Sequence, residues 1–267
     1  MAALAHNHRK VQRLRSLVGR RRARQDERAF VVEGAKVVGE ALDSERGVES
    51  LFFDPAASGP AELAVVERAR RADCEVSELA SGVLERVAGT VTPQPLLAIV
   101  SQLDRALEEL PRHGLIVLCA DVRDPGNAGT VLRSADAAGA DAAVLTGNSV
   151  DPYNGKAVRA SAGSLFHLPL AIDPDTADVV ATLKQQGLAV LAADGAGDLG
   201  LDDAIDADLL GRPTAWLFGN EAAGLPEAAL ELADRRVRVP LHGRAESLNL
   251  ASAAAVCLYA SARAQRP

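Results

Sequence analysis

Three separated segments of the sequence carry the residues best suited to chemistry, and each joins an apolar run to a polar loop. They are residues 121–135, residues 217–226 and residues 239–250. Their amide, carboxylate, hydroxyl and guanidinium groups can bind a ligand and stabilise charge that develops during a reaction. The second and third segments each place such a loop after an apolar run, which predicts a pocket at the edge of an open α/β sheet.

The pattern around the second and third segments indicates how they are held. Residues 216–218 are apolar and aromatic, which suits a buried strand. Gly219 and Gly224 then allow a close backbone approach or a turn with positive φ. Ser247 is expected to cap a final alanine-rich helix that ends near residue 263.

Asn127 and Arg133 in the first segment lie six positions apart, so they do not share a face of one helix. We therefore expect Asn127 at or before the start of its helix, as a capping or loop residue. Arg133 has two interpretations: a cation of the site, or a surface residue paired with Asp136.

The elements that position these segments alternate between strand and helix after residue 114. Residues 115–120 form an apolar run typical of a central parallel strand. The alternation predicts a parallel sheet with helices on both faces. Further strands are expected at 142–145, 168–172 and 188–193, helices at 127–138 and 176–186, and a helix followed by a turn over 156–166.

The first part of the chain predicts a smaller α/β unit behind a basic arm. Residues 1–28 carry nine Lys or Arg and two Asp or Glu, a balance of +7 in a chain of net charge −7. Residues 10–18 read as a short amphipathic helix, and a solvated arm is the alternative to nucleic-acid contact. Residues 29–100 alternate strands and helices, and residues 101–113 form a polar linker to residues 114–267. The predicted phosphate contacts are Arg20, Arg21, Arg22 and Arg24.

Composition excludes several classes of protein. The 267 residues are 48% hydrophobic, enough for a substantial core, and three distant cysteines favour a reducing compartment, the cytoplasm. We predict no membrane span, because no apolar run is long enough, and no metal, because the five histidines lack ligand spacing. A G-x-G-x-x-G pattern at residues 195–200 hints at a dinucleotide site, but the carboxylates that follow would repel a pyrophosphate.

The three segments, in this order, resemble motifs 1, 2 and 3 of the SPOUT class of RNA methyltransferases, in the TrmH-like (SpoU) branch that methylates ribose 2′-hydroxyls. The resemblance covers about residues 30–260. It implies an α/β catalytic domain with a deep trefoil knot, and a homodimer whose site lies near the subunit interface. Residues 29–100 resemble the L30e-like RNA-binding domain of many relatives, through Glu33-Gly34 and the Val-Val-x-Glu-Ala-Leu stretch after it.

The resemblance implies S-adenosylmethionine as the cofactor, held mostly by main-chain groups of the second and third segments. Apolar members of these segments have core packing as an alternative or additional role. The positions that match the family's cofactor pocket are Gly219, Val239 and Leu248, followed by Leu241, Asn220 and Ala192.

The resemblance makes Arg133 the catalytic arginine, with Asn127 helping to place it. A guanidinium has a pKa above about 12, so we expect it to stabilise the nascent alkoxide and grip the adjacent phosphate rather than remove a proton. Glu221 is expected to hold an arginine or a ribose hydroxyl. Ser247 can reach substrate while capping its helix, and Asn249 offers both a donor and an acceptor.

These features lead us to expect an S-adenosylmethionine-dependent enzyme that methylates ribose 2′-hydroxyls of 23S ribosomal RNA. Transfer RNA is the alternative substrate. A catalytically silent RNA-binding protein of the same fold and a dinucleotide-dependent oxidoreductase are the alternative classes, and the smaller domain could lack any RNA role.

Overall fold

The computed structural model describes residues 3–111, 114–173 and 175–266, and the chain forms two compact units. The first unit comprises Met1–Leu103 and Asp151–Phe166, and the second comprises Asp104–Val150 and His167–Pro267. This division differs from the expected domains in two places. The basic arm is part of the first unit, and so is Asp151–Phe166, which we had expected in the second domain.

The first unit is a small α/β fold, as predicted. Its sheet has the order β1-β4-β2-β3, in which β4 runs antiparallel to β1 and β2, and β2 runs parallel to β3. The strands are β1 (Ala29–Glu33), β2 (Ser50–Phe53), β3 (Glu75–Glu78) and β4 (Leu96–Ser101). The helices are α1 (Arg9–Gly19), α2 (Arg21–Glu27), α3 (Ala35–Asp43), α4 (Pro60–Arg71), α5 (Leu84–Val87), α7 (Gly155–Ser161) and the short η2 (Ser164–Phe166).

Helix α1 confirms the expected amphipathic helix but is not a free arm. Its apolar face, formed by Val11, Leu14 and Leu17, is fully buried with the side chains of the β1–β4 sheet and α5. Burying three such side chains stabilises the fold by about 5 kcal/mol or more. The helix is therefore a structural part of the first unit.

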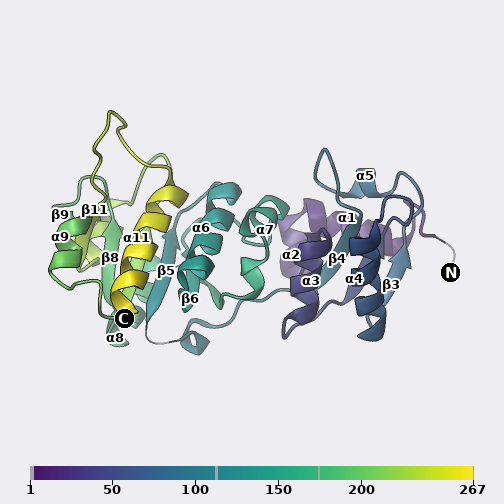
Figure 1. Ribbon diagram of the computed structural model, residues 1–267, viewed down its shortest axis with the longest axis horizontal. Helices are drawn as coiled ribbons and strands as arrows, with labels where there is room; N and C mark the ends of the chain where they lie inside the picture. Colours follow the sequence, from purple (N-terminus) through teal and green to yellow (C-terminus); the bar gives the residue numbers. More distant parts are fainter. Residues whose placement is uncertain (1–2, 112–113, 174, 267) are drawn as a thin grey trace. The chain divides into compact units, whose positions relative to one another are not determined.

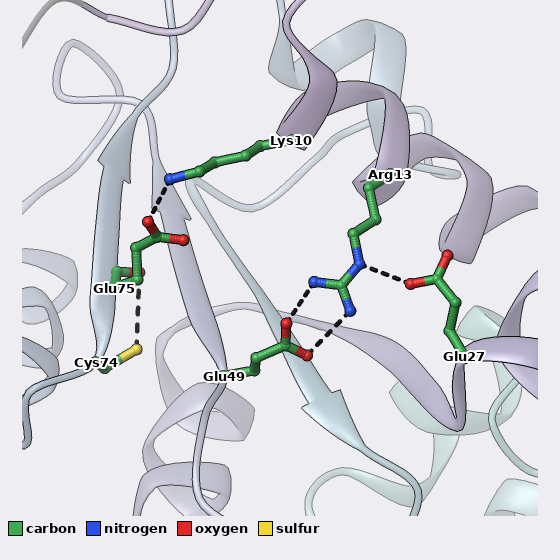
Figure 2. Close-up of polar contacts among 6 residues, drawn as sticks. All are labelled: Lys10, Arg13, Glu27, Glu49, Cys74 and Glu75. Atoms are coloured by element: carbon green, nitrogen blue, oxygen red, sulfur yellow. Dashed lines mark hydrogen bonds and ion pairs between the residues drawn. The ribbon is translucent and has the colours of Figure 1, made fainter.

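Ion pairs on the polar face of α1 bind it to the sheet (Figure 2). The Arg13 guanidinium lies between two carboxylates, with Nε 2.6 Å from Glu27 Oε2 and Nη1 2.5 Å from Glu49 Oε1. The hydrogen bond with Glu49 contributes most, and together with the bond to Glu27 it raises the pKa of Arg13 above its ordinary value. Lys10 pairs with Glu75 beside it. Part of the arm's positive charge is thus used inside the unit.

Arg24 corrects one of the predicted phosphate contacts. Its side chain is only 3% exposed, with Nε 2.8 Å and Nη2 2.7 Å from Asp151 Oδ2. Nη1 also donates to the Leu17 carbonyl at 2.8 Å. A buried, fully paired guanidinium cannot reach a nucleic-acid phosphate without leaving a carboxylate unpaired. Long-range partners such as Asp151 are not visible in local sequence patterns.

The second unit confirms the predicted parallel sheet. In the described residues its strands have the order β7-β6-β5-β10-β8-β11-β9, and every neighbouring pair is parallel. The strands are β5 (Leu115–Ala120), β6 (Ala142–Thr146), β7 (Leu170–Asp173), β8 (Ala189–Ala193), β9 (Leu199–Gly200), β10 (Thr214–Phe218) and β11 (Arg235–Arg238). Strand succession reverses direction between β5 and β10, where ligands bind in open α/β sheets.

Helices cover this sheet, and α6 (Pro125–Ala138) packs against α11 (Leu250–Gln265), which is yellow in Figure 1. Trp216 of β10 is fully buried under α11 and its Nε1 donates to Ser261 Oγ at 2.8 Å. No helix among the described residues is long and apolar enough to cross a membrane. The remaining helices are η1 (Leu107–Glu109), α8 (Thr176–Gln185), α9 (Leu201–Asp206) and α10 (Glu227–Leu232).

Candidate active site

The predicted segments meet at the carboxyl edge of the second sheet. Strands β5, β10, β8 and β11 are consecutive neighbours and parallel, so their carboxyl ends share one edge. The loop after β5 begins the first segment, the loop after β10 carries the second, and the third follows β11. Residues that are more than 100 positions apart in the sequence are thereby brought together.

The second segment is a tight turn built around Asn220. The backbone groups of Asn220 and Gly224 bond each other in both directions at 2.9 Å. Asn220 Oδ1 accepts from the N–H groups of Ala222 and Ala223 at 3.0 and 3.1 Å. Gly224 has φ +69°, and a Cβ on Gly219 would lie 2.5 Å from the Gly224 carbonyl. Both glycines are therefore required by the turn itself.

Two side chains of that turn hold the loop after β5. The Glu221 carboxylate accepts from the backbone N–H groups of Arg123 and Asp124, at 3.4 and 3.2 Å. Asn220 Nδ2 donates to the Asp121 carbonyl at 3.0 Å. We had expected Glu221 to hold an arginine side chain or a ribose hydroxyl, whereas here it orders the main chain of the first segment.

Asn127 and Asn249 join the first segment to the third. Asn249 Nδ2 donates to Asn127 Oδ1 at 3.0 Å. The predicted caps require two corrections. Asn127 lies within the first turn of α6, whose cap is Asp124, and Asn249 rather than Ser247 caps α11. Asn249 fills that position because its Oδ1 accepts from the N–H groups of the first turn, leaving Ser247 in the exposed loop.

Arg133 lies on the exposed side of α6, six residues after Asn127 and on a different face of the helix. The alternative partner, Asp136, instead lies 3.0 Å from His167 Nδ1. Within the described part of the chain, no side chain pairs with the Arg133 guanidinium. Its charge is therefore available to a phosphate or to a developing oxyanion.

The third segment offers main-chain groups to a ligand. Leu241 and Leu248 remain 42% and 38% exposed, and Val239 is half-buried. For residues 241–248, all of which the structure describes, no main-chain N–H donates to a backbone or side-chain acceptor. Free amide groups beside apolar side chains suit the adenine and ribose of S-adenosylmethionine. Ala192, also predicted for this pocket, is fully buried in β8 one strand away.

Other chemistry finds little support at this edge. Burial raises the pKa of Cys119 and of Cys257 to about 12. Because the thiolate is the nucleophile, neither thiol suits covalent catalysis at neutral pH. The G-x-G-x-x-G pattern at residues 195–200 contains the edge strand β9. The carbonyls of Gly197 and Asp198 each accept from Arg238 Nη1 at 2.8 Å, so the loop is already occupied by a side chain.

Asp121 and Asp124 are site residues that the sequence did not reveal. Asp121 has φ +56°, and its Oδ1 accepts from the N–H of Asn148 in the loop after β6 at 2.9 Å. A non-glycine residue held in the left-handed region often marks a functional loop. Asp124 accepts from the Asn127 N–H at 2.9 Å. The Asp-Pro pair at 124–125 is the local signal that could have identified this cap.

Comparison with known proteins reveals two family matches. Residues 114–259 match a model described as the SpoU rRNA Methylase family. Residues 8–98 match the MRM3-like substrate binding domain, a range that includes α1 and α2. The two matches correspond to the sequence segments that dominate the two units.

Individual relatives match over most of their length. A 23S rRNA (guanosine(2553)-2′-O)-methyltransferase, RlmP of Bacillus subtilis, is 34% identical over 86% of this chain and 87% of its own. A 23S rRNA (uridine(2479)-2′-O)-methyltransferase of Streptomyces viridochromogenes is 32% identical over 95% and 89%. The crystal structure of AviRb from the latter organism, in complex with AdoMet, superposes with a TM-score of 0.84 at 30% identity, covering 96% of this chain and 98% of that one.

Proposed function

The chain belongs to the SpoU rRNA methylase family, and from this we propose that it transfers a methyl group from S-adenosylmethionine to a ribose 2′-hydroxyl of 23S ribosomal RNA. The observation that carries the proposal is the joining of three distant segments at one sheet edge. The Asn249–Asn127 bond and the contacts of Glu221 with the loop after β5 together make that junction. Two of the relatives act on 23S ribosomal RNA.

The cofactor supplies a methyl group already activated on a sulfonium, so the chain must align the ribose oxygen and favour loss of its proton. The turn Asn220–Gly224 and the loop 239–249 would hold the cofactor through main-chain groups. Asn127, Glu221 and Asn249 act by fixing the loops, as their hydrogen bonds with protein groups indicate. Arg133 stabilises the developing alkoxide and the neighbouring phosphate, because a guanidinium remains charged throughout.

The proposal extends to the shape and assembly of the catalytic unit. A homodimer through α6 and α11 would cover Val256 and Tyr259, which are 43% and 53% exposed on α11. The same interface would bring Arg133 close to a second chain. The molecular mass in solution tests the proposed homodimer, and a monomer would contradict it.

We also propose the family's trefoil knot, supported by the path of the chain from β11 across the sheet edge to α11, which packs on α6. Because the proposed substrate is ribosomal RNA, we propose that the protein acts in the cytoplasm.

We propose that Arg20, Arg21 and Arg22 contact RNA phosphates, since all three are exposed at the start of α2. Because α1 belongs to the core, substitution tests this better than deletion. Changing all three to alanine should weaken binding to a 23S transcript and lower the slope of log K against log salt by up to about three. Filter binding measures both. The control changes Arg68, Arg70 and Arg71 of α4, and equal slopes in the two triple variants would contradict the contact.

Transfer of tritiated methyl groups tests the proposed activity directly. The purified protein is incubated with S-adenosyl-[methyl-³H]methionine and either an unmodified 23S ribosomal RNA transcript or unmodified transfer RNA. We expect incorporation into 23S RNA, in a form that blocks alkaline cleavage at the modified ribose. Incorporation into transfer RNA alone would favour the alternative substrate. Binding of the transcript without incorporation would identify a silent RNA-binding protein.

A further inference from the structure

The loop after β5 presents one cation whose backbone is fixed and whose side chain is not. Arg123 follows β5 by three positions, and its N–H donates to Glu221 at 3.4 Å. The adjacent Asp124 N–H donates to the same carboxylate at 3.2 Å. The Arg123 side chain is exposed, and the contacts of the described residues include no acceptor for its guanidinium.

Hydrogen bonds from two neighbouring loops fix the backbone on the amino-terminal side of Arg123. Asp121, two residues earlier, is held at φ +56° with its carbonyl bonded by Asn220 Nδ2 and its carboxylate bonded by the Asn148 N–H. Val122, which lies between Asp121 and Arg123, is held through both of its main-chain groups. Its N–H donates to Ser149 Oγ at 3.2 Å, and its carbonyl accepts from the Val150 N–H at 2.8 Å. Loops from β6 and β10 therefore fix the direction from which the Arg123 side chain leaves the backbone.

Two anions of the proposed reaction could bind Arg123: a phosphate of the RNA and the carboxylate of the cofactor. The proposed cofactor groups follow β10 and β11, which lie on one side of β5 in the strand order. Arg123 lies in the loop after β5, three positions past the strand and two positions before α6 begins at Pro125. A planar guanidinium binds a phosphate through two parallel hydrogen bonds. The exposed guanidinium of Arg123 is therefore suited to a backbone phosphate of the RNA, and binding of the cofactor's carboxylate is the competing outcome of the test below.

We propose that Arg123 binds a backbone phosphate of the RNA at the target nucleotide and so positions the ribose for methyl transfer, an inference that rests on the proposed function. Arg123 is a substrate-positioning residue, whereas Arg133 acts on the reacting oxygen. Glu221 contributes by fixing the main chain from which this side chain projects. The contact carries no base information, because phosphate contacts position a nucleic acid without reading its sequence.

The test compares Arg123→Ala and Arg123→Lys with Arg212→Ala. Arg212 is an equally charged, exposed residue, but it precedes β10 at the amino-terminal edge of the same sheet. Glu221 bonds main-chain groups of the loop, so removing the Arg123 side chain leaves these contacts in place. The measurements are affinity for an unmodified 23S transcript at several salt concentrations, affinity for S-adenosylmethionine by calorimetry, and kcat and KM for the transcript.

We expect Arg123→Ala to weaken transcript binding on the order of tenfold and to reduce the salt slope by about one. Arg123→Lys should retain the salt dependence of transcript binding, because the charge remains. It should lose the part of the affinity that comes from two parallel hydrogen bonds to the phosphate. Cofactor affinity should match the wild type in all three variants. Transcript affinity equal to that of Arg212→Ala, or a loss confined to cofactor affinity, would overturn the proposal. Absence of methyl transfer by the wild-type protein would instead refute the proposed function. The measurements of transcript affinity would still decide whether Arg123 contacts the RNA.

Discussion

We expect Arg133→Ala to abolish methyl transfer while leaving the affinity for S-adenosylmethionine nearly unchanged. The guanidinium is exposed on α6 and has no partner among the described side chains, so its removal costs little stability. The same removal takes away the cation that we propose stabilises the developing alkoxide. Loss of one such donor costs roughly 10²–10³-fold in kcat, and a donor that also grips phosphate should cost at least as much.

The measurement is single-turnover methyl transfer at saturating cofactor, with calorimetry for cofactor binding. Arg133→Lys is the matched variant, since it keeps the charge and loses the planar fork. We expect partial activity from the lysine variant and none from the alanine variant. Near-normal turnover by Arg133→Ala would show that this residue is a surface cation. Equal loss in both variants would indicate that fork geometry, rather than charge, is essential.

The effect of Arg133 differs in kind from that of Asn127. Asn127 has its Oδ1 occupied by Asn249 Nδ2 at 3.0 Å, and its N–H is occupied by Asp124. The structure therefore shows the contact that Asn127 makes with another loop. For Arg133 it shows only a charge with no partner among the described residues. The two residues lie on different sides of α6, and the proposed function gives each a separate task at one site. The asparagine ties the loops together, and the proposed function gives the arginine the contact with the substrate.

Local patterns predicted much of the second unit because its central strands β5, β6 and β10 are buried along their whole length. The apolar run of residues 115–120 coincides with β5, Leu115–Ala120, and all six residues are buried. Boundaries at helix starts were less accurate because several polar residues near each start compete for the cap. Asn249 and Asp124 occupy those positions through hydrogen bonds to the first turn, whereas we had assigned them to Ser247 and Asn127.

Long-range polar partners account for the rest of the differences. The sequence around residue 151 continues a βα pattern, yet Asp151 pairs with buried Arg24 and the Tyr153 ring lies 4.7 Å from that of Phe30. These contacts place Asp151–Phe166 in the first unit. No periodicity in either stretch encodes a partner more than 100 positions away. A basic cluster likewise does not reveal which of its members is buried.

Gly219 should be the least replaceable small residue of the site. A Cβ at this position would lie 2.5 Å from the carbonyl carbon and oxygen of Gly224 and 2.6 Å from the Leu225 nitrogen. Real Cβ atoms do not come so close to backbone atoms, so the turn itself must move. We expect Gly219→Ala to lower the free energy of unfolding by about 1–3 kcal/mol, as for other overpacked positions. We also expect it to weaken S-adenosylmethionine binding by at least tenfold.

The second effect follows from the architecture of the turn. Moving Gly224 breaks its paired backbone bonds with Asn220, and Asn220 and Glu221 hold the loop after β5. One methyl group should therefore disturb two of the three segments, although it touches no ligand. Calorimetry measures the affinity, and thermal unfolding verifies that the variant remains folded.

Gly195→Ala provides the matched control, because no heavy atom lies within 4 Å of a Cβ built there. It is also the first glycine of the G-x-G-x-x-G pattern, so an unchanged cofactor affinity would argue again that this pattern is not the ligand site. A folded Gly219→Ala variant that binds S-adenosylmethionine as tightly as Gly195→Ala would mean that the turn after β10 does not form the cofactor pocket. The cofactor would then have to be held by the loop 239–249 alone, without the segment that joins it to the loop after β5.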